Sequence, residues 1–177
     1  MAPSLRKKKK KGRKPVVAAT VPPLDADQLR GFFKRNRVTE KYFIGVFSRG
    51  DLPKKIPRRK CFAVLNTDKF YQKGIHWVLV YYNPGETVFF CSFGNTPSIY
   101  NYDLIVQNAF FPVVTNIQQV QSATSAVCGY HVCVLAHFLS LDYDLTTILA
   151  RFYTLRNTHN DALAVDFVLK ANGGVPL

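Results

Sequence analysis

The chain has 177 residues, 47% of them hydrophobic and 20% charged, which is enough for one domain with a core of its own. It contains no run of 18 or more apolar residues and no apolar segment behind its N-terminal charges, so we expect neither a membrane span nor a secretory signal. Four cysteines in a chain of this size do not indicate a disulfide scaffold and favour a reducing compartment.

Positive charge is concentrated at the start of the chain. Residues 1–60 contain 19 Lys or Arg against 4 Asp or Glu, whereas residues 61–177 contain 5 against 7. The sequence predicts a basic disordered arm over residues 1–23, followed by one folded domain over 24–177. Cations of the arm can release counterions from phosphates, so we expect DNA or RNA as a partner; a solubilising tail and a nuclear-localisation signal are the other interpretations. The predicted nucleic-acid-binding residues are Arg6, Lys7, Lys8, Lys9, Lys10, Lys11, Arg13 and Lys14.

The first half of the domain reads as one helix followed by strands. Acidic residues begin and basic residues end the segment 25–36, which predicts a helix. A short apolar run covers 43–47. β-rich segments bounded by turn residues predict strands over 61–68, 76–83 and 87–94, the last two forming an antiparallel hairpin.

The second half is mainly helical. A helix is expected within 97–110, and 113–121 reads as a fourth strand or an edge segment. Residues 128–141 are apolar on nearly all sides, which is typical of a buried helix, and two further helices are predicted over 142–153 and 160–174. We therefore predict an α+β domain, with a small mixed or antiparallel sheet packed against helices.

Cys128 and His76 are the candidates for nucleophilic chemistry. Cys128 lies at the predicted start of the buried helix, where free N–H groups and the helix dipole are expected to lower the pKa of a thiol. His76 opens a predicted strand, and a neighbouring imidazolium would favour the thiolate further. Gly129 is expected to let a substrate backbone come close to the thiol.

Four short motifs accompany this pair: His76-Trp77, FFCSFG at 89–94, Gln121, and Cys128-Gly129. Together they resemble the adenain family, which comprises adenovirus-type cysteine proteases that also occur in virus-like mobile elements and are related to SUMO-specific proteases. The similar region spans about 42–167, and Gln121 precedes Cys128 by seven residues, as in the family.

The resemblance implies roles for these residues. Cys128 would attack the scissile carbonyl, His76 would take and return the proton, Gln121 would donate to the oxyanion, and Trp77 would shield the imidazole from water. It also implies a monomeric endopeptidase that processes viral precursor proteins during virion maturation, located in the host nucleus or the virion. No cofactor is expected apart from a DNA or peptide activator, which the resemblance allows.

Cys91 is where the chain departs from the family, which has Asp or Glu at this place in the FFCSFG segment. A thiol is a poor substitute for a carboxylate in fixing the histidine tautomer. Both a weak dyad enzyme and an inactive descendant are therefore open interpretations. Asn95, four residues on, is a second candidate for orienting His76.

The remaining cysteines and histidines read as structural. Cys61, Cys133, His131 and His137 are expected in the core, and no cysteine pairs at zinc spacing predict a metal site. Two other functions remain as alternatives. One is a catalytically weakened or inactive homologue that acts as a DNA-bound structural or interaction protein, and the other is a protease of ubiquitin-like modifiers.

Overall fold

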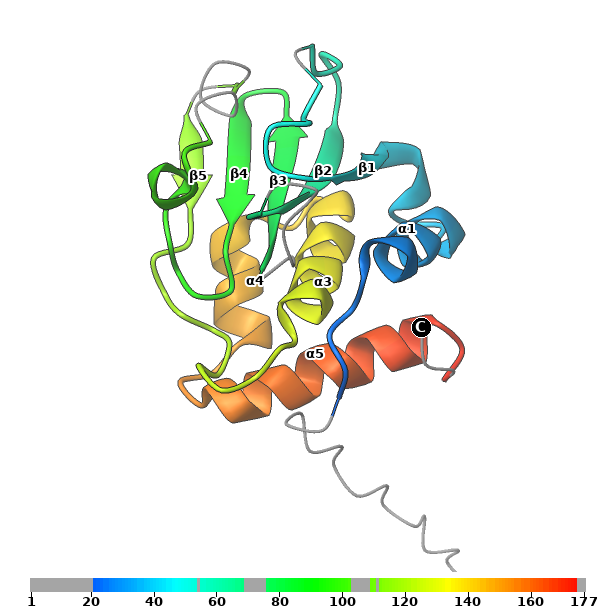
Figure 1. The fold of residues 1–177 in the computed structure, drawn as a ribbon, viewed down its shortest axis with the longest axis vertical. Coiled ribbons are helices and arrows are strands. Elements are labelled where there is room, and N and C mark those ends of the chain that lie inside the picture. The colour runs from blue at the N-terminus through cyan, green and yellow to red at the C-terminus, as the bar shows by residue number, and fades with distance from the viewer. Residues whose placement is uncertain (1–20, 54, 69–75, 103–108, 111, 175–177) are drawn as a thin grey trace, which may run out of the picture.

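A computed structural model describes residues 21–53, 55–68, 76–102, 109–110 and 112–174, and the arm residues 6–14 lie outside this part. A five-stranded mixed sheet forms its centre (Figure 1), with strands in the order β1-β2-β3-β4-β5. The inner three strands pair antiparallel, whereas the edge strands β1 and β5 run parallel to their neighbours. The strands are β1 (Phe43–Phe47), β2 (Cys61–Asn66), β3 (Trp77–Asn83), β4 (Glu86–Phe90) and β5 (Val113–Thr115).

Helices cover one face of this sheet. In Figure 1, α3 lies against the strands, α4 packs against α3, α5 crosses below α3, and α1 lies beside β1. Two single 3-10 turns, η2 (Glu40–Tyr42) and η3 (Pro97–Tyr100), interrupt the connections. The helices are α1 (Ala26–Arg35), α3 (Cys128–Ser140), α4 (Leu145–Phe152) and α5 (Asn157–Ala171).

Both faces of the sheet are buried, which explains why the strand segments are almost continuously apolar. Along β3, Leu79 and Tyr81 point to the helical side, while Val78, Val80 and Tyr82 point to the opposite side. On that opposite side, the described residues that pack against the sheet come from loops and from η3, and they include Leu52, Ile56, Tyr100 and Tyr102. We call these residues the loop layer. It brings Tyr100 next to Cys91, the residue that follows β4.

Local sequence signals explain where two of the helices begin. The Asp25 side chain accepts hydrogen bonds from the N–H groups of Asp27 and Gln28, and the Gln28 side chain returns one to Asp25, which is a complete capping box. Asp144 caps α4 in the same manner through Thr147. No described side chain caps α3, and the N–H groups of Tyr130 and His131 bond to the Val127 carbonyl.

The predicted α+β class is confirmed, and strands and helices predicted after residue 60 are present, with one correction. Of the span 97–110, in which a helix is expected, the described residues include the 3-10 turn Pro97–Tyr100, and residues 103–108 lie outside the described part, so this helix stays a prediction. The strand expected over 113–121 ends at Thr115, because the chain then leaves the sheet to run towards α3. Within the described residues, no helix is long and apolar enough to cross a membrane.

Candidate active site

Cys128 is the first residue of α3 and is 5% exposed. The backbone N–H of Trp77, at the start of β3, donates a hydrogen bond to its Sγ at 3.4 Å. This bond joins two segments that are 51 residues apart and brings the residue after His76 onto the thiol. The two candidates that sequence reasoning selected therefore lie in the same region of the fold, joined through the backbone that follows His76 and not through its ring.

The pKa of Cys128 differs from the expectation. Burial raises the pKa of the thiol above its usual value, and hydrogen bonds from the N–H groups of Trp77, Gly129 and Cys128 itself offset this only in part. The expectation that the helix N-terminus lowers the pKa is therefore wrong for the free protein, because desolvation is the larger effect. Cys128 rests as a neutral thiol and needs a base.

His76 can supply that base. Burial lowers the pKa of its imidazole to about 4, with a smaller repulsive contribution from His131, so the ring is neutral at pH 7. Its Nε2 lies 3.3 Å from Sγ of Cys91, and the Phe93 ring packs over it with centroids 4.8 Å apart. Nδ1 is buried and has no hydrogen-bond partner in the part of the chain that the structure describes. With the ring proton on Nε2, the free lone pair of Nδ1 is the one that can accept a proton.

Cys91 occupies the place where a triad would have its acid. It follows β4 directly and is wholly buried. Asn116 holds its backbone on both sides, accepting from the Cys91 N–H at 3.0 Å and donating to the Cys91 carbonyl at 2.7 Å. The side chain is thus fixed at hydrogen-bond distance from His76, although a thiol is a weak acceptor.

Tyr100 and Asn95 extend this contact by two further hydrogen bonds. The Tyr100 hydroxyl lies 3.3 Å from Sγ of Cys91 and accepts from Nδ2 of Asn95 at 2.9 Å. Burial, reinforced by the bond to Cys91, raises the pKa of Tyr100, so its hydroxyl keeps its proton. Asn95 therefore acts on Tyr100 and not on the imidazole, which was the alternative considered from the sequence.

Gln121 lies in the loop before α3 and is 1% exposed. Its Oε1 accepts from the Ser92 hydroxyl at 2.6 Å, and its Nε2 donates to the Ser125 carbonyl at 2.8 Å. An amide carries two N–H groups, so one remains after the bond to Ser125. Since Gln121 lines the same cavity as Cys128, that second N–H can serve a substrate oxygen there.

A cavity of about 670 Å³ brings these groups to one opening. Its wall combines the catalytic candidates with apolar residues, the cation of Arg30 and the carboxylate of Asp25. The wall residues most relevant to the chemistry are His76, Trp77, Phe93, Gln121, Cys128, Leu24 and Arg30.

The segment Val21–Asp25, which we call the strap, forms one side of this cavity. The Trp77 indole N–H donates to the Leu24 carbonyl at 2.8 Å, and the Tyr130 hydroxyl donates to the Pro22 carbonyl at 3.3 Å. A Cβ on Gly129 would lie 3.1 Å from the Leu24 side chain. Gly129 therefore admits the strap and the Trp77 ring, not the substrate backbone, which corrects the expectation for this glycine.

Sequence reasoning missed Tyr100, Asn116, Ser92 and the strap. None of them carries a local signal, because each acts through a contact between distant segments. Three of the four expected core residues are buried: Cys61, Cys133 and the hydrogen-bonded histidine His131. His137 was also expected in the core but is only half-buried, since it lies towards the end of α3. Among the described residues, no group of three or more His, Cys, Asp or Glu could hold a metal ion.

Comparisons with family models and with curated proteins give no match, so the function has to be argued from the residues of the site. No family model matches the chain, and no curated protein sequence matches it.

Proposed function

We propose that the chain is a cysteine endopeptidase in which Cys128 is the nucleophile and His76 is the general base. The observation that carries the proposal is the bond from the Trp77 N–H to Sγ of Cys128, because it joins the thiol to the backbone directly after His76, and both side chains line one cavity. The imidazole there is neutral, and its Nδ1 has no hydrogen-bond partner among the described residues. A neutral Cys–His pair at a cavity is suited to acyl transfer, since the proton moves only when substrate is in place.

The reaction follows from the donors and acceptors around the pair. Nδ1 of His76 removes the Cys128 proton as Sγ attacks the scissile carbonyl, and the Nε2–H of the resulting imidazolium donates to Cys91. The oxyanion receives the free N–H of Gln121 and the backbone N–H of Cys128. The imidazolium then protonates the leaving amine, and water activated by His76 hydrolyses the thioester to release the acid and the thiol.

The substrate class proposed from the family resemblance is precursor proteins of a virus or virus-derived element, which would place the enzyme in the host nucleus or the virion. The test is a peptide-library cleavage assay of the wild type beside Cys128→Ala, with a thiol-reactive peptide probe as a second readout. Turnover and labelling that both disappear in the variant support the proposal. A folded wild type that neither cleaves nor reacts contradicts it.

A protease of ubiquitin-like modifiers is the nearest alternative substrate class. Both hypotheses predict a labelled Cys128, so the probe does not separate them. A panel of ubiquitin-like proteins with C-terminal extensions does: cleavage confined to that panel would replace the precursor proteins as substrates.

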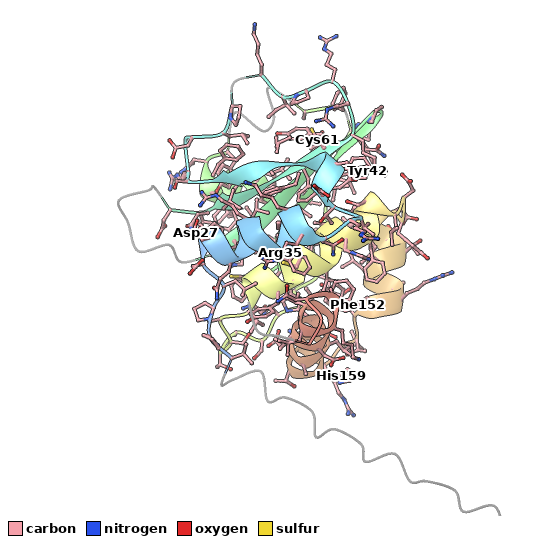
Figure 2. All side chains as sticks on the ribbon, turned by 90° about the vertical axis from the view of Figure 1, so that its right-hand side faces the viewer. Asp27, Arg35, Tyr42, Cys61, Phe152 and His159 are labelled. Atoms are coloured by element: carbon pink, nitrogen blue, oxygen red, sulfur yellow. The ribbon has the colours of Figure 1, made fainter. Side chains whose placement is uncertain are left out.

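The second candidate function is a DNA-bound structural or interaction protein. The concentration of charge in residues 1–60 favours it, and so does the exposure of the cations between the last turn of α1 and the start of β2. Figure 2 views the molecule from this side, where Arg35 is labelled on α1. The exposed cations are Lys34, Arg35, Arg37, Lys41, Lys55, Arg58 and Arg59.

DNA binding is tested by the salt dependence of affinity for a duplex of random sequence. Removing residues 1–14 should flatten the slope of log K against log salt by roughly 0.9 for each phosphate that the arm neutralises. An unchanged slope would exclude the arm as the binding surface, and Arg58→Ala with Arg59→Ala would then test the folded part. Comparing proteolysis with and without DNA shows whether binding and cleavage are linked.

A further inference from the structure

The loop that carries Gln121 is held from both sides by the first turns of α5. Nδ2 of Asn160 donates to the carbonyl of Val120 at 3.1 Å, directly before Gln121. The carboxylate of Asp161 accepts from the N–H of Ser122, directly after Gln121, at 3.3 and 3.2 Å to its two oxygens. Two consecutive residues of one helix thus hold the two peptide units that flank the candidate oxyanion donor.

Both of these α5 residues are buried. Asn160 is 0% exposed and Asp161 is 1% exposed. Asn160 is itself fixed by the backbone of Thr154, to which it donates at 2.9 Å and from which it accepts at 2.8 Å. A buried carboxylate is costly unless it is paired, so a buried Asp at this position needs a partner.

That partner connects the loop to the nucleophile's helix. Oδ1 of Asp161 lies 2.9 Å from Nε2 of His131, which is on α3 three residues after Cys128, and Nδ1 of His131 lies 3.2 Å from the Tyr153 hydroxyl. The carboxylate therefore bonds both to the loop of Gln121 and to the helix of Cys128. Any displacement of Asp161 would change the position of one relative to the other.

We infer that Asp161, with Asn160, is a positioning residue for Gln121 and sets the distance between the oxyanion donor and the Cys128 thiol. The inference rests on the proposed protease function and adds two residues that do not line the cavity. They touch no substrate, so their influence must pass through Gln121. Oxyanion donors are sensitive to such placement because they act on charge that develops at one point in space.

The test is a double-mutant cycle on kcat with Asp161→Asn and Gln121→Ala. Gln121→Ala should lower kcat by about 10²–10³-fold. Asp161→Asn, which keeps the size but removes the charge and the two-oxygen interaction, should lower kcat by about tenfold and change KM little. In the Gln121→Ala background the same Asp161→Asn change should cost no more than about twofold, because its effect requires the Gln121 side chain.

Matched controls separate positioning from general damage. Asp166→Asn changes the same residue type on the same helix at an exposed ion pair with Lys170, and it should leave kcat unchanged. Alkylation of Cys128 by iodoacetamide needs no oxyanion donor, so its rate should be the same in wild type and Asp161→Asn. If Asp161→Asn does not fold, Asn160→Ser takes its place in the cycle, since it removes the bond to Val120 and keeps the Asp161–His131 pair.

The outcomes distinguish the inference from the function on which it rests. If the wild type shows turnover and the kcat losses of Asp161→Asn and Gln121→Ala simply multiply in the double variant, the inference is overturned and the protease function stays intact. A slower alkylation in Asp161→Asn would also overturn it, since the damage would then include the thiol. A wild type without turnover would refute both.

Discussion

Two buried histidines of this domain have opposite surroundings. His131 has a hydrogen-bonding neighbour at each ring nitrogen, a carboxylate from Asp161 on one side and the Tyr153 hydroxyl on the other. His76 has a thiol at Nε2 and, among the described residues, nothing at Nδ1. The arrangement usual in a catalytic triad, a histidine with a carboxylate, is therefore found at the histidine that does not line the cavity.

The contrast teaches that a carboxylate–histidine pair is not by itself a sign of catalysis. Both rings are desolvated, and burial is the first cause lowering the pKa of each. What distinguishes His76 is that its residue lines the same cavity as Cys128 and that its buried Nδ1 has no hydrogen-bond partner among the described residues. We expect the two sites to respond differently to mutation: His76 should control rate, and His131 should control stability.

The largest expected effect is the loss of turnover in His76→Ala. Without the base, the neutral Cys128 thiol has no acceptor for its proton, so kcat/KM should fall by about 10³-fold or more. The measurement is steady-state cleavage of the best library peptide. His159→Ala is the matched control, because His159 is exposed and does not line the cavity. Figure 2 labels its position on α5. Equal losses in both variants would contradict the assignment of the base.

The next effect is on stability and concerns the other ring. His131→Leu removes the ring partner of Asp161 and leaves its buried carboxylate with the Ser122 N–H alone, which should lower the free energy of unfolding by about 3–5 kcal/mol. Urea denaturation followed by circular dichroism gives this value. His137→Leu, at a half-buried ring with a hydrogen bond to Asn36, should cost clearly less. If His131→Leu loses less free energy of unfolding than His137→Leu, the His131–Asp161 pair does not stabilise the fold.

A pH titration of stability sharpens the comparison further. The pKa of His76 is about 4 in the folded chain against an ordinary value of 6.5, so between these pH values the unfolded chain binds the proton and the folded chain does not. Stability should therefore fall as pH drops from about 6.5 towards 4, with His76 contributing at most about 3 kcal/mol. His76→Asn should flatten the curve in this window. An unchanged curve would mean that His76 is not desolvated in solution.

The smallest expected effect is a gain. Cys91→Asp would give His76 the carboxylate that His131 already has, and the new group would find two donors, Nε2–H of His76 and the Tyr100 hydroxyl. We expect kcat/KM to rise about tenfold, equivalent to about 1.4 kcal/mol of transition-state stabilisation. Because the position is wholly buried, a melting curve must accompany the kinetics. A variant that folds normally and turns over no faster would mean that the carboxylate adds nothing at this position.

The sequence predicted those features that repeat along the chain. Apolar runs with turn residues located the strands, and the acidic start and basic end of the segment 25–36 located α1. The motifs around His76, Gln121 and Cys128 were enough to select residues that line one cavity. The apolar runs are local signals, and the motifs keep their order and spacing along the chain, so both can be recognised from the sequence alone.

What the sequence could not predict depends on long-range contacts. Tyr100 reaches Cys91 only because the loop layer folds under the sheet, and Asn116 holds Cys91 from a segment 25 residues away. The pKa of Cys128 was misjudged for the same reason. The helix N-terminus is readable from sequence, but the depth at which α3 is buried is set by the whole fold. Gly129 was also misread, since the strap that fills its space precedes it by more than a hundred residues.

The bond between the Trp77 indole and the Leu24 carbonyl has a practical consequence. Trp77 is the single tryptophan of the chain, so its fluorescence originates entirely within the cavity wall. An indole that loses its hydrogen bond to the strap, or gains a peptide beside it, changes its emission. Tryptophan emission of the unlabelled protein should therefore change when a peptide enters the cavity or when the strap moves. The measurement needs no nucleophile, so it also works in Cys128→Ala.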